Sequence, residues 1–174
     1  MTKQRVLVAY GTKHGATAGI AQEIGQVLDE EGFTTEVLPA AEVTTVADFD
    51  AVILGSALYM NHWQRDALRC AHRHVRELER RPVWLFSSGP VDSSAEQHEI
   101  PPVAQVAEEM ERLHARGHVT FGGSVTAETP GFVARSLVRH DKGGDFRSPE
   151  HIRRWARQIG ADLRAHEDRG RTGS

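Results

Sequence analysis

The chain lacks several features that would place it in a specialised class. It has 1 cysteine in 174 residues, which excludes an intrachain disulfide framework and a zinc site built on cysteines. It has no surplus of positive charge, because 21 Lys and Arg against 24 Asp and Glu give a formal net charge of -3. We therefore expect no nucleic-acid partner. It also has no apolar run long enough to cross a bilayer, since the longest, 51–60, is interrupted by Gly55 and Ser56.

What is present is typical of one ordinary domain. Hydrophobic residues make up 39% and charged residues 26% of the chain. We expect a single domain over 1–166, with an inserted loop at about 126–147, and a frayed polar tail over 167–174. The first apolar segment, 6–10, is shorter than the hydrophobic region of a signal peptide, so a cytoplasmic location is expected.

Strand-like and helix-like patterns alternate along the chain. Nearly continuous apolar segments predict central parallel strands at 5–10, 51–54 and 83–86. More polar segments at 34–38 and 118–125 predict strands nearer the edges of the sheet. This alternation favours an α/β fold with a doubly wound, five-stranded parallel sheet of order 2-1-3-4-5 and helices on both faces. In such a sheet the ligand site lies beyond the carboxyl ends of the strands.

Apolar residues three and four positions apart predict four helices. The first stops before Gly32. The second is continuous, with Asn61 as its N-cap and Pro82 after it, the third opens at 101–102 and stops at Gly117, and the last begins around Pro149. The side chains expected to face the core from these helices are Ile20, Ala21, Ile24, Val27, Leu28, Ala67, Leu68, Ala71, Val75, Leu78, Val103, Val106, Ala107, Met110, Leu113, Ile152, Trp155, Ala156, Ile159 and Leu163.

The loop after the first strand carries groups that suit a phosphate. Residues 11–17 read Gly-Thr-Lys-His-Gly-Ala-Thr and run directly into a helix, so two hydroxyls and a series of backbone N–H groups meet at the positive helix end. The spacing is that of neither a Walker A loop nor a GxGxxG turn. From the residues alone, a phosphate loop and a Gly- and Thr-rich turn that only caps a helix are even alternatives.

The wider pattern Tyr10-x-Thr12-x-x-Gly15-x-Thr17-x-x-x-Ala21-x-x-Ile24 resembles the FMN-binding signature of the flavodoxin family. The resemblance implies FMN as the cofactor. It also implies that the FMN phosphate is held by the loop residues Thr12, Lys13, His14, Gly15, Ala16 and Thr17. Lys13 is unusual for this loop, and we expect its side chain to point to solvent.

The same resemblance assigns two further loops to the cofactor. The second loop, 55–63, would lie along the isoalloxazine ring, with Tyr59 stacked on it and Met60 at its edge. Trp63 is either a further ring contact or an anchor for the following helix. The third loop would approach the pyrimidine edge, or else form a surface turn. The residues assigned to FMN in these two loops are Ala57, Leu58, Tyr59, Met60, Ser88, Gly89, Pro90 and Val91.

The second loop also bears on mechanism. Electron-transfer flavodoxins often have a glycine here, which lets a peptide flip during one-electron reduction. In this chain no glycine follows Gly55 within the loop, and Asn61 is the nearest residue that tolerates positive φ. The sequence therefore favours an oxidoreductase that transfers two electrons over a one-electron carrier.

Within the family, the chain resembles the menaquinone-dependent protoporphyrinogen oxidase group. The features that carry this likeness are Gly55, the aromatic loop up to Trp63, the Gly143-Gly144 turn and the insertion before the last helix. The likeness implies transfer of two electrons from a bound donor, protoporphyrinogen-like or other, to a quinone-type acceptor. The apolar and basic segment 132–140 in that insertion is a lid, a surface for a quinone or porphyrin, a peripheral membrane contact, or a loop folded over the sheet edge.

Two alternatives stay open: an electron-transfer flavodoxin without its own substrate, and a flavin-free binding module on the same fold. No side chain is assigned as a catalytic acid or base, and His14 and His62 are expected at the surface. No metal site is expected, because His72 and His74 lie two apart on a helix and point to different faces. The sequence does not define the oligomeric state.

Overall fold

A computed structural model describes residues 3–11, 16–89, 102–122, 124–125, 144–145 and 149–172. Its centre is a parallel sheet in the order β2-β1-β3-β5-β6, which is 2-1-3-4-5 when the parallel strands are counted along the chain, as predicted. The more polar β2 and β6 lie at the edges. The five strands are β1 (Arg5–Gly11), β2 (Thr34–Pro39), β3 (Ala51–Tyr59), β5 (Val83–Ser88) and β6 (Gly117–Phe121).

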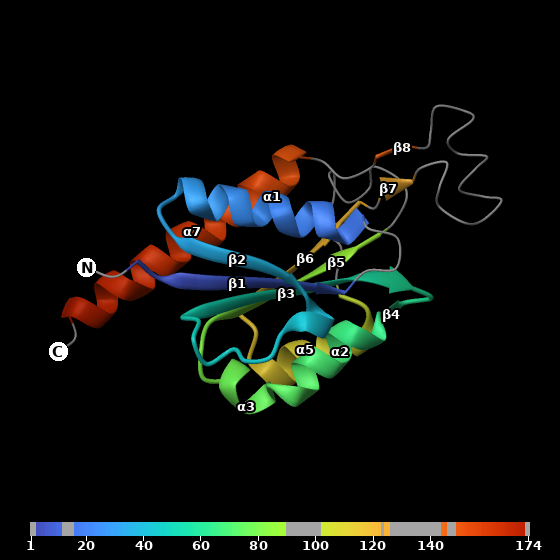
Figure 1. The fold of residues 1–174 in the computed structure, drawn as a ribbon, viewed down its shortest axis with the longest axis horizontal. Helices are drawn as coiled ribbons and strands as arrows, with labels where there is room; N and C mark the ends of the chain where they lie inside the picture. The colour runs from blue at the N-terminus through green and yellow to red at the C-terminus, as the bar shows by residue number, and fades with distance from the viewer. Residues whose placement is uncertain are drawn as a thin grey trace.

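The sheet contains a sixth, short strand that the sequence did not predict. β4 (His62–Trp63) pairs antiparallel with the end of β3, so the segment predicted to be an open loop is a β-hairpin that extends from the carboxyl edge. Figure 1 shows this hairpin at the right-hand end of the molecule, where the parallel strands end.

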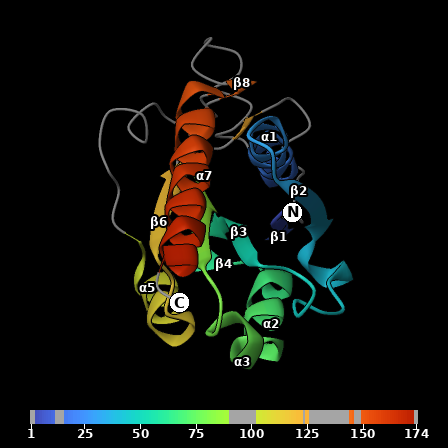
Figure 2. The ribbon, with the colours of Figure 1, turned by 90° about the vertical axis from the view of Figure 1, so that its left-hand side faces the viewer.

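Helices cover both faces of the sheet. α1 (Ala16–Glu30) and α7 (Pro149–Thr172) pack side by side on one face. α2 (Arg65–Arg73), α3 (Val75–Leu78) and α5 (Ala104–Leu113) cover the other, and the short 3-10 helix η1 (Ala40–Glu42) packs against α2. Figures 1 and 2 show the sheet between these two layers.

The core has two parts because successive side chains of a strand point to opposite faces. Toward α1 and α7 the strands contribute Val6, Val8, Ile53 and Phe86. Toward α2 and α5 they contribute Leu7, Ala9, Val52, Leu54 and Leu85. Most helix side chains predicted to face inward are fully buried, and Trp155, Leu68, Val75, Val103 and Met110 are partly buried against the same two clusters.

The second predicted helix differs from the structure at its start and in its middle. Asn61 is not its N-cap: α2 begins after Gln64, and Asn61 lies in the hairpin turn with φ 65°. The helix is also broken at His74, whose φ of -111° and ψ of 21° are not helical, so the apolar stripe is divided between α2 and α3. A continuous stripe therefore indicated the buried face correctly but not the break.

The third predicted helix is shorter at its C-terminal end than expected. α5 ends at Leu113, and His114 adopts the left-handed conformation with φ 54°, which is the usual way to end a helix. Gly117 does not stop the helix but begins β6. Glu109, between the apolar positions of α5, is buried where a charged side chain was not expected.

Two predictions near the C-terminal end also change. The strand predicted over 118–125 is two strands, β6 and β7 (Ser124–Val125), and β7 pairs antiparallel with β8 (Gly144–Asp145). This pairing brings together the two ends of the predicted insertion at about 126–147, whose segment 132–140 lies outside the described residues. α7 continues to Thr172, past the start of the tail predicted at 167.

Candidate functional site

The structure brings the starts of the candidate loops together at one edge of the sheet. Gly11, the last residue of β1, pairs with Ser56 of β3, and Ala57 of β3 pairs with Ser88 of β5. The first, second and third loops therefore leave three adjacent strands at the same level. This is the position at which open α/β sheets bind their ligands.

The first loop enters α1 through Thr17, whose side chain is completely buried. Its Oγ1 has no hydrogen-bond partner among the described residues. A buried hydroxyl without a partner is unfavourable by about 1–3 kcal/mol, so such groups usually have a ligand or water. Because Thr17 lies in the first turn of α1, an anionic ligand at the helix N-terminus would supply the missing acceptor.

The second loop is a hairpin with a two-residue turn. Leu58 pairs with Trp63 and Tyr59 with His62, which leaves Met60 and Asn61 as the turn. Both have positive φ, 51° for Met60 and 65° for Asn61, so the turn is of type I′. Tyr59 is 58% exposed and Met60 78% exposed, which makes them the large hydrophobic side chains most open to solvent in the described part of the chain.

The base of the hairpin is anchored to its surroundings. Trp63 is buried, its indole N–H donates to Ser87 Oγ at 3.0 Å, and its backbone N–H donates to Gln105 Oε1 of α5 at 2.8 Å. The Gln64 backbone N–H donates to Ser56 Oγ at 2.8 Å. Of the two roles considered for Trp63, the structure shows the anchor.

Ser87 connects this anchor to a histidine on β6. Its Oγ lies 3.1 Å from His118 Nε2. Because the Trp63 indole can only donate, Ser87 Oγ accepts there, and its own hydrogen is available for a neutral His118 Nε2. Burial lowers the pKa of His118 to about 4, so the imidazole is uncharged at neutral pH. No sequence pattern indicates this Trp–Ser–His network, since its members come from three separate elements.

The third loop leaves β5 in a conformation that requires glycine. Gly89 has φ 143°, which side-chain-bearing residues rarely adopt, and its N–H donates to the Phe121 carbonyl at 2.8 Å. The preceding Ser88 is buried at the strand end. A Cβ at Gly89 would lie 3.8 Å from the Leu58 Cβ, so Gly89 lies beside the start of the hairpin.

Gly55, by contrast, is explained by packing. A Cβ at this position would lie 2.3 Å from three atoms of the Phe86 ring. Phe86 in turn packs against Phe121 and Trp155, with ring centroids 6.1 and 6.3 Å away. The glycine before the second loop therefore admits an aromatic ring to the core.

The comparison with protein families agrees with this geometry. A family model described as a flavodoxin domain matches residues 7–144, well over half of the chain. The chain belongs to the flavodoxin family. The match begins in β1 and runs through the three loops at the carboxyl edge. No protein with a curated description matches the chain.

Solved structures similar to this flavodoxin-family chain include complete flavodoxins. A flavodoxin from the domain Archaea has a TM-score of 0.61 at 12% identity, covering 92% of this chain and 99% of that one. Oxidised flavodoxin 1 from Bacillus cereus has a TM-score of 0.57 at 17% identity, covering 93% and 98%. Rubredoxin oxygen:oxidoreductase from Desulfovibrio gigas has a TM-score of 0.63 at 16% identity and 92% coverage, but this chain spans only 36% of its length. At these identities the similarity establishes the fold.

Flavodoxins bind FMN, so the expected cofactor is confirmed at the level of the family. The residues at the carboxyl edge fit such a ligand, because the unpartnered Thr17 hydroxyl and the positive end of α1 suit a phosphate. Tyr59 and Met60 offer an aromatic ring and a thioether to a flat ring system.

The individual site residues stay predictions. Those placed by the structure at the carboxyl edge are Thr17, Ala57, Leu58, Tyr59, Met60, Ser88 and Gly89. Ala16 is the first residue of α1, and its side chain is not described. Thr12, Lys13, His14, Gly15, Pro90 and Val91 lie outside the described residues.

Two searches of the described part of the chain bear on other classes of site. No group of three His, Cys, Asp or Glu side chains within it is placed to hold a metal ion. No helix in the same residues is long and apolar enough to cross a membrane. His72 contacts Glu109 on α5 at 2.8 Å, whereas His74 is buried near the end of α2.

Proposed function

We propose that this flavodoxin-family chain is an FMN-dependent oxidoreductase that transfers electrons in pairs, from a bound donor to a quinone-type acceptor. The observation that supports paired transfer is the hairpin turn at Met60 and Asn61. A chain that carries single electrons would gain from a second-loop peptide that is free to flip, and this turn opposes such a flip.

The reason lies in the backbone angles that a flip requires. Turning over the central peptide of a type I′ turn converts it to type II′, in which the first turn residue has φ of about +60° and ψ of about -120°. That region is occupied almost only by glycine. Met60 is the first turn residue, so its Cβ opposes the flipped state. The anchored Trp63 and Gln64 keep the hairpin from moving as a whole.

Different residues at the carboxyl edge of the sheet would bind different parts of the cofactor. FMN, when bound, supplies the electron and hydride chemistry. Thr17 and the N–H groups of the first turn of α1 would hold its phosphate, and Tyr59 and Met60 would cover the ring system. The backbone around Gly89 would line the opposite edge. We assign no side chain the role of an obligatory acid or base.

The acceptor and donor classes are supported by chemistry that is complementary to the site. A quinone is flat and largely apolar, as are the exposed surfaces of Tyr59 and Met60. A protoporphyrinogen-like donor is supported by the sequence resemblance. Anaerobic oxidation of protoporphyrinogen with menadione as acceptor tests the donor and the acceptor together. If the protein reduces menadione with another donor but not with protoporphyrinogen, only the acceptor class of the proposal is kept.

The turn itself is tested by a matched pair of variants. Met60→Gly removes the Cβ that opposes the flip, whereas Asn61→Gly changes the second turn residue, which a flip returns to ordinary negative φ. A reductive titration of the FMN-loaded proteins measures the equilibrium ratio of one-electron-reduced cofactor to the other forms. We expect this ratio to be small in the wild type and in Asn61→Gly. In Met60→Gly it should be at least about tenfold larger, which corresponds to a difference of about 1.4 kcal/mol.

The alternatives predict different spectra. A wild-type protein that already accumulates most of its flavin in the one-electron form would be an electron-transfer flavodoxin without its own substrate. A purified protein with no flavin absorption, and with no saturable binding when stripped protein is titrated with FMN, would be a flavin-free module.

A further inference from the structure

Arginines form a regular stripe along α2. Arg65, Arg69 and Arg73 are spaced four residues apart, so they lie on one face of the helix, and all three are exposed. None of them takes part in an ion pair or hydrogen bond among the described residues. We call these three side chains the α2 arginine stripe.

Several other arginines of the chain have carboxylate partners instead. Arg153 donates to Glu23 and Glu30 at 2.7 and 2.6 Å, and Arg116 donates to Asp162 at 3.2 Å. The whole chain has a net charge of -3, yet the stripe keeps its positive charge unneutralised. A local surplus of positive charge on a negative molecule indicates a surface that recognises negative charge.

A small cavity lies beside the stripe, between α2 and η1. Its volume is about 120 Å³, and it is lined by Asp66, Arg69, Cys70 and Arg73 of α2 and by His74, at which the helix is broken. Burial raises the pKa of Cys70 to about 11, so the thiol is neutral and the two guanidinium groups outweigh the single Asp66 carboxylate. A cavity of this size and charge accommodates a carboxylate side chain.

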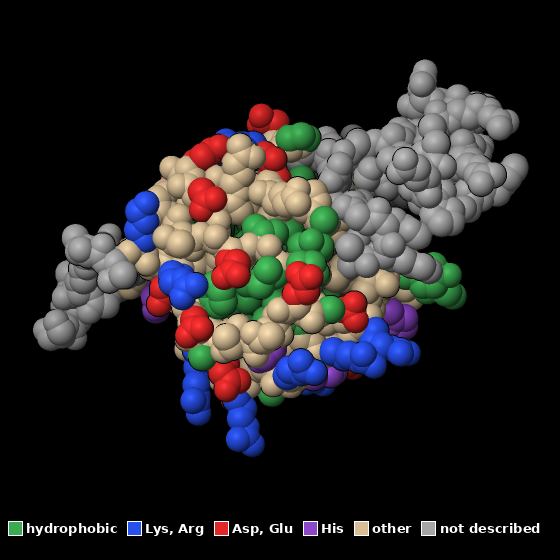
Figure 3. Space-filling view, viewed as in Figure 1, with side chains coloured by type: hydrophobic (Ala, Val, Ile, Leu, Met, Phe, Trp, Pro, Cys, Tyr) green, Lys and Arg blue, Asp and Glu red, His purple; other side chains and the backbone are tan. Residues whose placement is uncertain are grey.

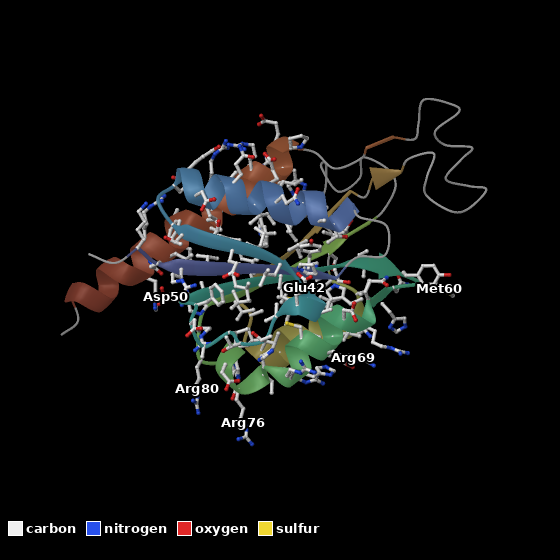
Figure 4. All side chains as sticks on the ribbon, viewed as in Figure 1. Glu42, Asp50, Met60, Arg69, Arg76 and Arg80 are labelled. Carbon is white, nitrogen blue, oxygen red and sulfur yellow. The ribbon has the colours of Figure 1, made fainter. Side chains whose placement is uncertain are left out.

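The stripe is next to the exposed end of the proposed cofactor site. α2 begins two residues after β4, so Arg65 follows the hairpin that carries Tyr59 and Met60. Figure 3 shows Lys and Arg side chains along the lower right edge, beside hydrophobic side chains at the right-hand end. In Figure 4, Met60 is at that end and Arg69 lies below it on α2, whereas Arg76 and Arg80 project further away.

We propose that the α2 arginine stripe and the hairpin tip form a docking surface for an acidic protein. Carboxylates of the partner pair with Arg65, Arg69 and Arg73, one of them entering the cavity beside η1, while Tyr59 and Met60 form the apolar centre of the contact. The partner would bind beside the proposed FMN site, so its position relative to the cofactor rests on the proposed function; the surface itself does not depend on it.

The chemistry of the surface favours a protein over an anionic membrane. Tyr, Met and Arg are the residue types enriched in protein interfaces, and the planar guanidinium matches a carboxylate with two parallel hydrogen bonds. Surfaces that bind anionic lipid are instead clusters of four or more basic residues with few acids. Here Asp66 lies among three arginines, and Tyr59 and Met60 are the two large apolar side chains exposed in the described part of the chain.

The test uses charge reversal with a matched control. The stripe variant is Arg65→Glu, Arg69→Glu and Arg73→Glu; the control is Arg80→Glu, Arg154→Glu and Arg157→Glu, which makes the same change in net charge at exposed positions away from the hairpin. Binding of a fluorescently labelled oligo-glutamate peptide to the FMN-loaded proteins is followed by anisotropy at low and at 0.15 M ionic strength. We expect wild type and control to bind with a salt-sensitive affinity, and the stripe variant to bind at least about tenfold more weakly.

Each other result overturns the inference. Equal peptide affinity in the stripe variant, or equal losses in both variants, would show that the stripe is not the docking surface. Wild-type protein that sediments with phosphatidylserine vesicles but does not bind the peptide would make the surface a membrane contact. FMN titration of the same proteins tests the proposed function separately. A failure of the docking surface is therefore distinguishable from a failure of the proposed function, because peptide binding is measured without any redox step.

Discussion

At the residue scale, His118 makes the stability of the chain depend on pH. It is held neutral by burial, with its pKa lowered from 6.5 to about 4, while it contacts Ser87 at the base of the hairpin. The unfolded chain therefore binds a proton near pH 6.5 that the folded chain does not bind until about pH 4. The folded state has its full stability above pH 6.5 and loses stability as the pH falls through 6.5 toward 4.

His118→Gln removes this titration while keeping a polar side chain beside Ser87. Urea unfolding at pH 7 and pH 5 should show a loss of stability on acidification that is about 2 kcal/mol larger in the wild type than in the variant. If the two proteins lose the same stability between these pH values, the imidazole is not held neutral by its surroundings.

At the scale of packed elements, the absence of a side chain at Gly55 of β3 leaves the space that the Phe86 ring of β5 occupies. A methyl group at Gly55 would meet three Phe86 ring atoms at 2.3 Å, closer than packed carbon atoms can lie. We expect Gly55→Ala to destabilise the protein by about 1–3 kcal/mol in urea unfolding. Phe86→Leu removes these ring atoms, so Gly55→Ala should cost much less when made in that background. Equal costs in the two backgrounds would show that the ring is not the obstacle.

Sequence patterns predicted correctly those elements in which the burial of apolar side chains alone sets the spacing. The apolar strands and the buried faces of α1 and α7 agree with the structure because burial alone sets their pattern. Asn61 was assigned to a helix cap because caps and left-handed turns favour the same residue type. The type I′ turn was not recognised because Met60, its other residue, is not a typical turn former. The buried Glu109 was not recognised because its partners, His72 on α2 and Arg112 on the next turn, are supplied by the fold.

At the scale of the whole molecule, the hairpin tip is separate from the core, whereas Leu58 and Trp63 at the base of the hairpin pack in the cluster beneath α2 and α5. The two hydrophobic clusters lie on the two faces of the sheet, and their completely buried residues include none of the exposed hairpin tip. The meeting of the candidate loops at one edge of the sheet was predicted from sequence, because strand order determines which carboxyl ends are adjacent. The hydrogen bonds that hold the hairpin in place could not be predicted, since Trp63, Ser87 and Gln105 are brought together only in the folded chain. A protein built in this way should fold cooperatively without its cofactor.

That separation gives a prediction for ligand-linked stability. Apoprotein should unfold in one cooperative transition, and FMN at about 1,000 times its dissociation constant should add about 4 kcal/mol to the free energy of unfolding. Thr17→Val removes a hydroxyl that has no partner in the described structure, so the apoprotein should be as stable as wild type or slightly more stable. If that hydroxyl donates to the phosphate, the variant should bind FMN about 10- to 100-fold more weakly, and its melting temperature should rise less with FMN at equal concentration. Apoprotein loss of stability together with unchanged FMN affinity would make Thr17 a structural residue and would place the phosphate elsewhere along the first loop.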